Sequence, residues 1–377
     1  MLGCILFGLF RVFPINEKKI LFNNFNGKGY GDSCKYIEDC LNKENNNYVI
    51  IWTVKKKYND IPAHIIQVKY LSIRWFYHMS TSKIWISNSR FASFVRKRKK
   101  QIYIQTWHGC LPLKKIEFDV LDKLPSKYVQ LMRHDSKMTD YMVSNSSFYD
   151  ELCKRAFLYD GKILKIGCPK NDTLINDNQV TIKERVCELY NISKETLIVI
   201  YVPTFRNSYD SNPYDIDFKR LKECIKNKYG KECEILVKLH PVALDVYRFE
   251  DDSNMILAND FNDTQQLLLA ADIIITDYSS VMFEGMIADK PVILYANDID
   301  SYVDERGFYF ELNELPFPLA KNNDELMDII ENNDLNEMKN KYDSFKERVG
   351  LVEEGVASKK VCELISGYID GEDNEQK

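Results

Sequence analysis

The stretch that decides the fold is "ADIIITDYSSVMFEG", residues 271–285. The apolar run from Ile273 to Ile275 predicts a buried strand, and the apolar spacing after Ser280 predicts a helix. In a parallel α/β sheet, ligands bind at the edge where each strand ends and the next helix begins. Ser279 and Ser280 would bring two hydroxyl groups to that edge, where they could bind a phosphate or a diphosphate. The alternative is an ordinary helix start, because Asp and Ser are preferred there in many proteins.

The same strand-then-helix pattern recurs on both sides of this stretch, and strands alternating with helices indicate parallel βαβ units. Strands are expected at 18–25, 47–54, 83–89, 101–109, 140–146 and 162–169, and again at 197–205, 233–241, 272–276 and 290–296. Helices are expected, among other places, at 70–82, 147–157, 217–229 and 337–368. A polar stretch at 175–196 separates the two series. The sequence therefore predicts an α/β protein of two Rossmann-like domains, residues 1–175 and 176–377, facing each other across a cleft, with the last helices closing the second domain.

Composition narrows the classes of partner and cofactor. The chain of 377 residues has 51 basic and 56 acidic residues, and this formal charge of -5 argues against a nucleic-acid partner. Its ten cysteines form no C-x-x-C pair, and its five histidines complete no zinc-ligand spacing. We therefore expect reduced thiols in a cytoplasmic protein, no metal ion and no cofactor.

Two features of the first half suggest a membrane surface. The first ten residues are apolar, too few for the ~20 that span a bilayer, and form either a first core helix or a helix lying in the membrane interface. The basic run "RKRKK", residues 96–100, is either a solvated loop or a contact for anionic lipid. Together they predict a first domain that contacts an anionic membrane surface.

His108, in "TWHG", follows a predicted strand. A neutral imidazole at that edge can accept a proton from an attacking hydroxyl group near pH 7, although a structural histidine would fit the same position.

Three further residues follow strands of the second half: Arg206, Lys238 and His240. Because these strand ends meet at one sheet edge, the three side chains predict a cradle for an anion. Lys170 in "GCPKND" and Arg306 in "ERG" add two more cations.

Taken in order, these motifs resemble those of the CDP-glycerol glycerophosphotransferase family. The matching pieces, which span residues 20–310, are "NFNGKGYGDSCKYI", "TSKIWISNS", "WHG", "PLKKI", "GCPKND", "YVPTFR", "KLHP", "TDYSSVMFE", "KPVILY" and "DERGFYF". The resemblance implies a GT-B fold whose second domain binds most of the donor. It also implies metal-independent transfer of glycerol phosphate from CDP-glycerol to a hydroxyl group of a lipid-linked acceptor, with release of CMP, in teichoic-acid-like or capsular polymer synthesis. Such an enzyme would act on the inner face of the cell membrane as a peripheral protein.

The family's functional positions carry over residue by residue. His108 matches the histidine proposed as the base, and His240 matches a second histidine near the diphosphate. The positions that contact the donor in the family correspond here to Gly109, Pro203, Thr204, Ser279, Ser280 and Glu284. We expect the cations Lys170, Arg206, Lys238 and Arg306 to assist them.

Three departures from the family pattern keep alternatives open. The loop after His108 is one residue longer and has Cys110 where Thr is usual, Lys170 replaces Arg, and Glu284 replaces Asp. The alternatives are a ribitolphosphotransferase using CDP-ribitol, a GT-B glycosyltransferase using a nucleotide sugar, and a non-catalytic membrane scaffold. The motifs do not distinguish a primase from a polymerase.

Overall fold

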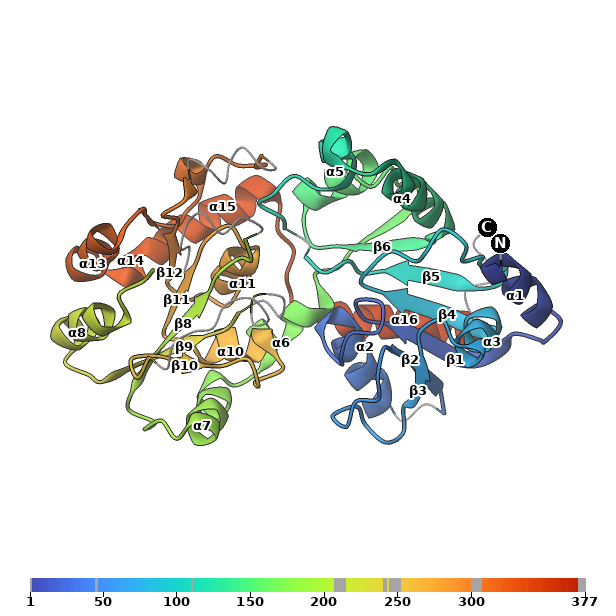
Figure 1. The fold of residues 1–377 in the computed structure, drawn as a ribbon, viewed down its shortest axis with the longest axis horizontal. Coiled ribbons are helices and arrows are strands. Elements are labelled where there is room, and N and C mark those ends of the chain that lie inside the picture. The colour runs from blue at the N-terminus through green and yellow to red at the C-terminus, as the bar shows by residue number, and fades with distance from the viewer. Residues whose placement is uncertain are drawn as a thin grey trace. The chain divides into compact units, whose positions relative to one another are not determined.

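The computed structural model describes residues 2–44, 47–109, 111–206, 215–239, 243, 252–299 and 307–371. It divides into two compact units, each built on its own parallel sheet (Figure 1). The first unit comprises residues 1–110, 116–172 and 351–377, and the second comprises residues 111–115 and 173–350. The chain therefore passes from one unit to the other four times, at 110/111, 115/116, 172/173 and 350/351.

The sheet of the first unit has seven strands in the order β3-β2-β1-β4-β5-β6-β7. Its strands are β1 (Asn16–Asn23), β2 (Val49–Val54), β3 (Ile66–Lys69), β4 (Ser82–Ser87), β5 (Ile102–Gln105), β6 (Tyr141–Ser144) and β7 (Lys162–Lys165). Its helices are α1 (Leu2–Phe10), α2 (Asp32–Lys43), α3 (Ile73–Thr81), η1 (Glu117–Lys123), α4 (Ser126–Met138), α5 (Ser147–Arg155), η2 (Pro169–Asn171) and α16 (Ala357–Asp370).

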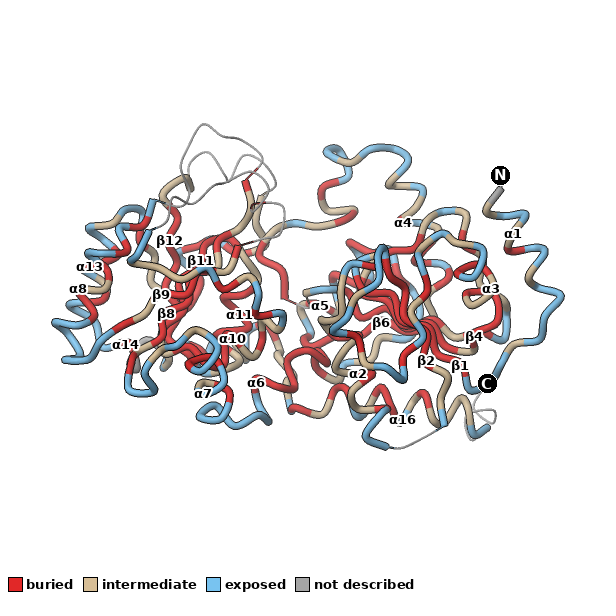
Figure 2. Tube along the Cα trace, turned by 60° about the horizontal axis from the view of Figure 1, so that its bottom comes forward, coloured by how far each residue is buried: buried red, intermediate tan, exposed pale blue. Residues whose placement is uncertain are grey.

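Helices cover both faces of this sheet because successive residues of a strand point to opposite sides. In β1, Ile20 and Phe22 pack with α2 and α16, whereas Leu21 packs with α1 and α3. The strands are accordingly the most buried part of the unit, as Figure 2 shows. This two-sided burial explains why the strands are nearly continuous apolar runs.

The second sheet has six strands in the order β10-β9-β8-β11-β12-β13. Its strands are β8 (Leu197–Val202), β9 (Cys233–Val237), β10 (Ile256–Leu257), β11 (Ile273–Thr276), β12 (Val292–Tyr295) and β13 (Leu319–Ala320). Its helices are α6 (Asp172–Asn176), α7 (Gln179–Tyr190), α8 (Phe218–Tyr229), α10 (Thr264–Ala270), α11 (Val281–Ile287), η3 (Leu312–Glu314), α13 (Asn323–Asn332), α14 (Leu335–Met338), η4 (Lys339–Lys341) and α15 (Tyr342–Val349). Helix α6 begins at Asp172, the last residue before the chain passes at 172/173 into the second unit.

Both sheets have the doubly wound order of Rossmann-like domains, in which the strand order reverses beside the first strand. The predicted α/β class and the pair of Rossmann-like domains are therefore confirmed.

The last part of the chain differs from the prediction. Residues 351–377, expected to close the second domain, belong to the first unit, where Val361, Cys362 and Ile365 of α16 pack into its core. The helix expected over 337–368 is interrupted because Gly350 ends α15 in a left-handed conformation (φ 61°). Leu351 then forms an antiparallel bridge with Ser146.

The polar stretch at 175–196 also differs, since it contains the helix α7. Asn178 caps its start by accepting a hydrogen bond from the Thr181 backbone N–H, and Asn191 ends it in a left-handed conformation. Only a narrow stripe, Ile182, Val186 and Cys187, is buried.

Candidate functional site

Several of the predicted site residues lie at or next to the point where the strand order of each sheet reverses: His108 and Gly109 follow β5, Pro203, Thr204 and Arg206 follow β8, and Ser279 and Ser280 follow β11. In the first unit this point lies between β1 and β4, with β5 next to β4. In the second unit it lies between β8 and β11. Ligands of doubly wound sheets bind at the carboxyl ends of the strands that flank such a point. The two sets of residues are described separately below, one for each unit.

His108 lies in the loop after β5, and its imidazole is held from two directions. Nδ1 lies 3.0 Å from the backbone carbonyl oxygen of Asn88, in the loop after β4. A carbonyl oxygen only accepts hydrogen bonds, so Nδ1 carries the proton and Nε2 keeps its lone pair. The Trp107 ring stacks on the imidazole with centroids 4.4 Å apart, and Phe25 lies 5.4 Å away.

The protonation state of His108 suits a base. The surrounding protein desolvates the imidazole, and this lowers the pKa of His108 below its ordinary 6.5, although the Asn88 carbonyl and the charge of Asp32 oppose the shift. The residue nevertheless keeps an exposed surface. A neutral, accessible imidazole with a free Nε2 can accept a proton at neutral pH.

The backbone that carries His108 is itself constrained. Trp107 has a positive φ of 52°, which is unusual for a residue with a side chain, and its backbone N–H donates to the Gln105 side chain over 2.9 Å. The Arg90 guanidinium lies 5.8 Å from the Trp107 ring and is paired with Glu117 and Asp135 in the interior. This packing fixes the loop that presents the imidazole.

Lys170 lies in the same unit as His108. It is buried, and its Nζ donates to the backbone carbonyl oxygen of His108 over 3.3 Å and lies 3.9 Å from an Asp32 carboxylate oxygen. Gly109 follows His108 and is half-buried. Lys170 therefore supports the His108 loop directly, a contact that the sequence did not predict.

In the second unit, Asp277 ties the ends of β8 and β11 together. The backbone N–H and hydroxyl group of Thr204 both donate to its carboxylate, the hydroxyl over 2.6 Å. Arg206 is buried between two carboxylates, with nitrogen–oxygen distances of 2.8 Å to Asp277 and 2.7 Å to Asp298. The Tyr278 hydroxyl donates to Asp298 over 2.9 Å. The positive charge of Arg206 is thus already offset within the protein.

The other predicted donor contacts of this unit surround the same strand ends. Ser279 and Ser280 precede α11 and are both half-buried, and the Ser279 hydroxyl oxygen accepts a hydrogen bond from the Val281 backbone N–H. Glu284 is buried and accepts a hydrogen bond from Gln265 over 2.9 Å.

Lys238 and Pro203 follow β9 and β8. Lys238 is half-buried, and its Nζ donates to the carbonyl oxygen of Phe261 over 2.6 Å. Desolvation lowers the pKa of Lys238. Pro203 is buried at the end of β8.

Three predicted positions lie outside the described residues: His240, Arg306 and Cys110. The structure also adds residues that the sequence did not single out, namely Asn88, Trp107, Asp32 and Asp298. The position of Asn88 could have been predicted from the sequence, since it directly follows a buried strand. No sequence pattern pointed to Asp298, because its partner Arg206 lies 92 positions away in the chain.

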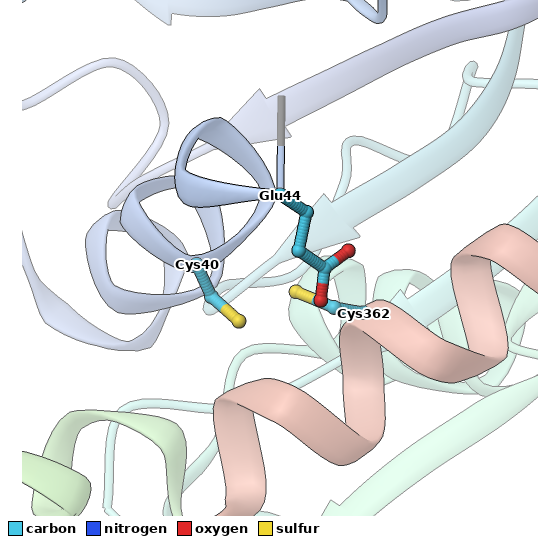
Figure 3. Close-up of side chains that lie close together, drawn as sticks. All are labelled: Cys40, Glu44 and Cys362. Atoms are coloured by element: carbon cyan, nitrogen blue, oxygen red, sulfur yellow. The ribbon is translucent and has the colours of Figure 1, made fainter. Parts of the chain in front are cut away.

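Among the described residues, one group brings three potential metal ligands together, although their spacing in the sequence matches no metal-binding motif. Cys40 and Glu44 lie one turn apart at the end of α2, and Cys362 projects toward them from α16 (Figure 3). Their ligand atoms lie within 4.8 Å of one another. Burial raises the pKa of both thiols, so both are neutral at pH 7, whereas a metal ion binds the thiolate.

Comparison with known proteins identifies relatives over the whole chain. The family model described as CDP-Glycerol:Poly(glycerophosphate) glycerophosphotransferase matches residues 5–367. A teichoic acid poly(glycerol phosphate) polymerase of Bacillus spizizenii is 29% identical over 96% of this chain and 95% of its own. A teichoic acid glycerol-phosphate transferase of Staphylococcus aureus is 32% identical over 93% of each chain. The chain spans about half of a longer polymerase of Staphylococcus epidermidis (51%).

Solved structures agree with these relatives. The wall teichoic acid polymerase TagF superimposes with a TM-score of 0.87 at 30% identity, covering 99% of this chain and 95% of that one. A histidine-to-asparagine variant of TagF soaked with CDPG also matches, with a TM-score of 0.85. The MnaA protein of S. aureus, solved with UDP, matches with a TM-score of 0.54 at 12% identity and so shares the fold alone.

Proposed function

This chain belongs to the CDP-glycerol:poly(glycerophosphate) glycerophosphotransferase family, and from that premise we propose that its acceptor is a hydroxyl group of a lipid-linked molecule. The chain is an enzyme that uses CDP-glycerol as the donor of glycerol phosphate. The product we propose is a teichoic-acid-like or capsular polymer, with CMP released at each transfer.

His108 is the proposed general base. The acceptor hydroxyl attacks the phosphorus that bears glycerol, the bond from that phosphorus to the bridging oxygen of CMP breaks, and the hydroxyl proton moves to Nε2 of His108. The observation that carries this role is the hydrogen bond from Nδ1 to the Asn88 carbonyl, because it leaves Nε2 unprotonated. The lowered pKa of His108 supports the role further, since a neutral imidazole is the competent form.

The strand ends of the second unit are the proposed donor site. Ser279, Ser280 and the backbone beside Pro203 would bind the diphosphate, with Lys238 as the cationic contact. Thr204 would contact the donor through its hydroxyl oxygen as an acceptor, because its N–H and O–H both donate to Asp277. We assign Arg206 a positioning role instead of a direct contact, because Asp277 and Asp298 already bind its guanidinium group. Glu284, Gly109, Lys170, Arg306 and the second histidine, His240, remain proposed contacts of the donor.

We further propose that the enzyme works at an anionic membrane surface. In the described part of the chain no helix is both long enough and apolar enough to span a bilayer. Helix α1 instead has two faces: Phe7 is buried against α3, whereas Ile5 and Leu9 are 59% and 61% exposed. The basic run of residues 96–100 contacts the turn that follows α1, because Arg98 donates to the carbonyl oxygen of Phe13 over 2.8 Å. An exposed apolar face beside several cations suits an interface with anionic lipid.

A donor panel tests the proposed reaction. The purified enzyme is supplied with a synthetic lipid-linked acceptor and with CDP-glycerol, CDP-ribitol or a UDP-sugar in turn. We expect CMP release to be fastest with CDP-glycerol and product mass to rise by glycerol phosphate units. Faster release from CDP-ribitol would establish the ribitol alternative, and UDP release alone would establish a glycosyltransferase. The number of units added separates a single transfer from polymerisation.

A further inference from the structure

The first unit contains a pocket that the proposed reaction does not use. Its volume is about 840 Å³, and it is formed by the chain between β2 and β3 and by the start of α3. Pockets of this size bind ligands comparable to a cofactor or a substrate. All of the residues that line it belong to the first unit.

The walls of this pocket combine apolar and cationic groups. Of the apolar residues that line it, Pro62, Ala63 and Ile73 keep accessible surface, and behind them lie the core residues Val54, Ile61, Ile65 and Val68. Among the described residues that line the pocket, four are cationic and none is acidic, although the chain as a whole carries a charge of -5. The four are Lys56, Lys57, Lys69 and Arg74. Such a lining complements a molecule that has both an apolar part and a negative charge.

The start of α3 adds backbone donors to the cations. Ser72 caps this nine-residue helix by accepting a hydrogen bond from the Trp75 backbone N–H over 3.2 Å, and Ser72, Ile73 and Arg74 all line the pocket. The backbone N–H groups of the first turn have no acceptor within a helix and favour an anion such as phosphate.

The wall and the rim of the pocket suit a lipid. Gln67 and Tyr58 exchange two hydrogen bonds of 2.8 and 3.0 Å, which fix one wall. Ile73, which lines the pocket, is 70% exposed, its near neighbour Leu71 is 48% exposed, and α3 also packs against the apolar helix α1. An apolar chain leaving a membrane would meet these side chains first.

We infer that this pocket binds the lipid phosphate of the acceptor, with the apolar chain against Pro62, Ala63 and Ile73 and the phosphate group against Lys56, Arg74 and the start of α3. The inference rests on the proposed function, which supplies a lipid-linked acceptor. A polyol phosphate chain fits less well, because it would leave the exposed Ala63 and Ile73 side chains uncovered.

The sheet relates this pocket to His108. Val54 of the pocket ends β2, and His108 follows β5, so both lie at the carboxyl edge of one sheet. The strand order β2-β1-β4-β5 separates them by three strand spacings, roughly 14 Å. A head group of about that length would carry the reactive hydroxyl from the pocket to His108. Acceptors with a clearly shorter head group should therefore react slowly.

Direct binding tests the pocket without relying on turnover. The probe is farnesyl diphosphate, titrated into the intact enzyme by calorimetry, with farnesol and inorganic diphosphate as its two separate halves. We expect the intact probe to bind at least about tenfold more tightly than either half. The inference would be overturned if inorganic diphosphate bound as tightly as the probe. It would also be overturned if phosphatidylglycerol vesicles displaced the probe as effectively as unlabelled farnesyl diphosphate does.

Reversing the charge of two cations in the pocket, and of two cations elsewhere in the same unit, tests the phosphate contacts. Lys56→Glu with Arg74→Glu should weaken probe binding and raise the KM for the lipid-linked acceptor by at least about tenfold, while the KM for CDP-glycerol stays unchanged. Lys127→Glu with Lys154→Glu makes the same charge change at exposed positions of the same unit and should alter neither quantity. Unchanged probe affinity in the pocket variant would overturn the inference. Failure of the wild-type enzyme to release CMP would instead contradict the proposed function and would leave the binding result to decide the pocket.

Discussion

At the scale of single residues, the proposed base role of His108 depends on which of its ring nitrogens carries the proton. The Asn88 carbonyl accepts a hydrogen bond from Nδ1, and the Trp107 ring stacks on the imidazole. The His108 tautomer is therefore set by a backbone oxygen. A substitution of the Asn88 side chain would not remove that oxygen. Three predictions belong to this scale.

Replacing the base should abolish most turnover while donor binding persists. General-base catalysis contributes typically ~100–10,000-fold, so His108→Ala should lower kcat by at least about 100-fold, with the Kd for CDP-glycerol unchanged. His134→Ala is a matched control, because His134 lies in the same unit and is held by the Val95 carbonyl. Near-normal turnover of the His108 variant would remove this residue from the base role.

The pH dependence of the wild-type enzyme should report the same imidazole. Desolvation lowers the pKa of His108 below 6.5, so the neutral form predominates at pH 7 and is lost only as the pH falls through that lowered value. We expect kcat/KM to be level above pH 6.5 and to decline below it. A decline that begins above pH 7 would contradict this assignment.

The two serines after β11 should affect the donor more than the chemistry. Ser279→Ala with Ser280→Ala removes two hydroxyl groups from the proposed diphosphate site and should raise the Kd for CDP-glycerol by about tenfold, with a smaller effect on kcat. Calorimetric titration measures that change. An unaltered Kd would mean that the diphosphate binds elsewhere.

At the scale of elements, the segment that returns from the second unit is joined to the first by a carboxyl group. Glu353 accepts hydrogen bonds from the side chains of Asn145 and Asn171 and from the backbone N–H of Cys168. It thereby connects the loop after β6, η2 and the approach to α16. These hydrogen bonds lower the pKa of Glu353, but burial outweighs them and raises it to about 7.

This raised pKa gives stability a definite dependence on pH. The carboxyl group binds its proton more tightly in the folded state than in the unfolded state, where its pKa is 4.5. Its contribution to the free energy of unfolding is complete below pH 4.5 and is lost as the pH rises through 7, a change of roughly 3 kcal/mol. Glu353→Gln should lack that slope, so denaturant titrations of the two proteins between pH 4.5 and 8 measure it. Parallel curves for both proteins would contradict the raised pKa.

Elements also show what the sequence could and could not predict. The strands were predictable because burial on two faces makes them continuous apolar runs, and so were the strand-end residues His108, Thr204 and Ser279. Helix α7 was missed because its buried stripe is only three residues wide. The pairing of Arg206 with Asp298 was missed because it joins distant positions, and no local pattern records such a contact.

At the scale of the whole molecule, the exposed face of α1 is the surface through which we propose that the enzyme contacts an anionic membrane. Ile5→Asp with Leu9→Asp should reduce binding to vesicles containing anionic lipid by at least about tenfold, because each side chain loses apolar burial and gains repulsion. Val180→Asp with Leu189→Asp is the matched control, since these residues of α7 are similarly exposed, at 66% and 53%. Sedimentation with vesicles measures both. Equal loss in the two variants would mean that charge alone, and no specific face, governs the contact.

The assignment of α16 to the first unit has a consequence for the order of events during protein synthesis. Val361, Cys362 and Ile365 complete a core that residues 16–165 begin, yet α16 is translated only after the entire second unit. At ordinary elongation rates the 186 residues from Asp172 to Ala357 take roughly 10–40 s to make. During that interval the nascent first unit exposes the apolar surface that α16 later covers, and a ribosome-associated chaperone would find its binding site there.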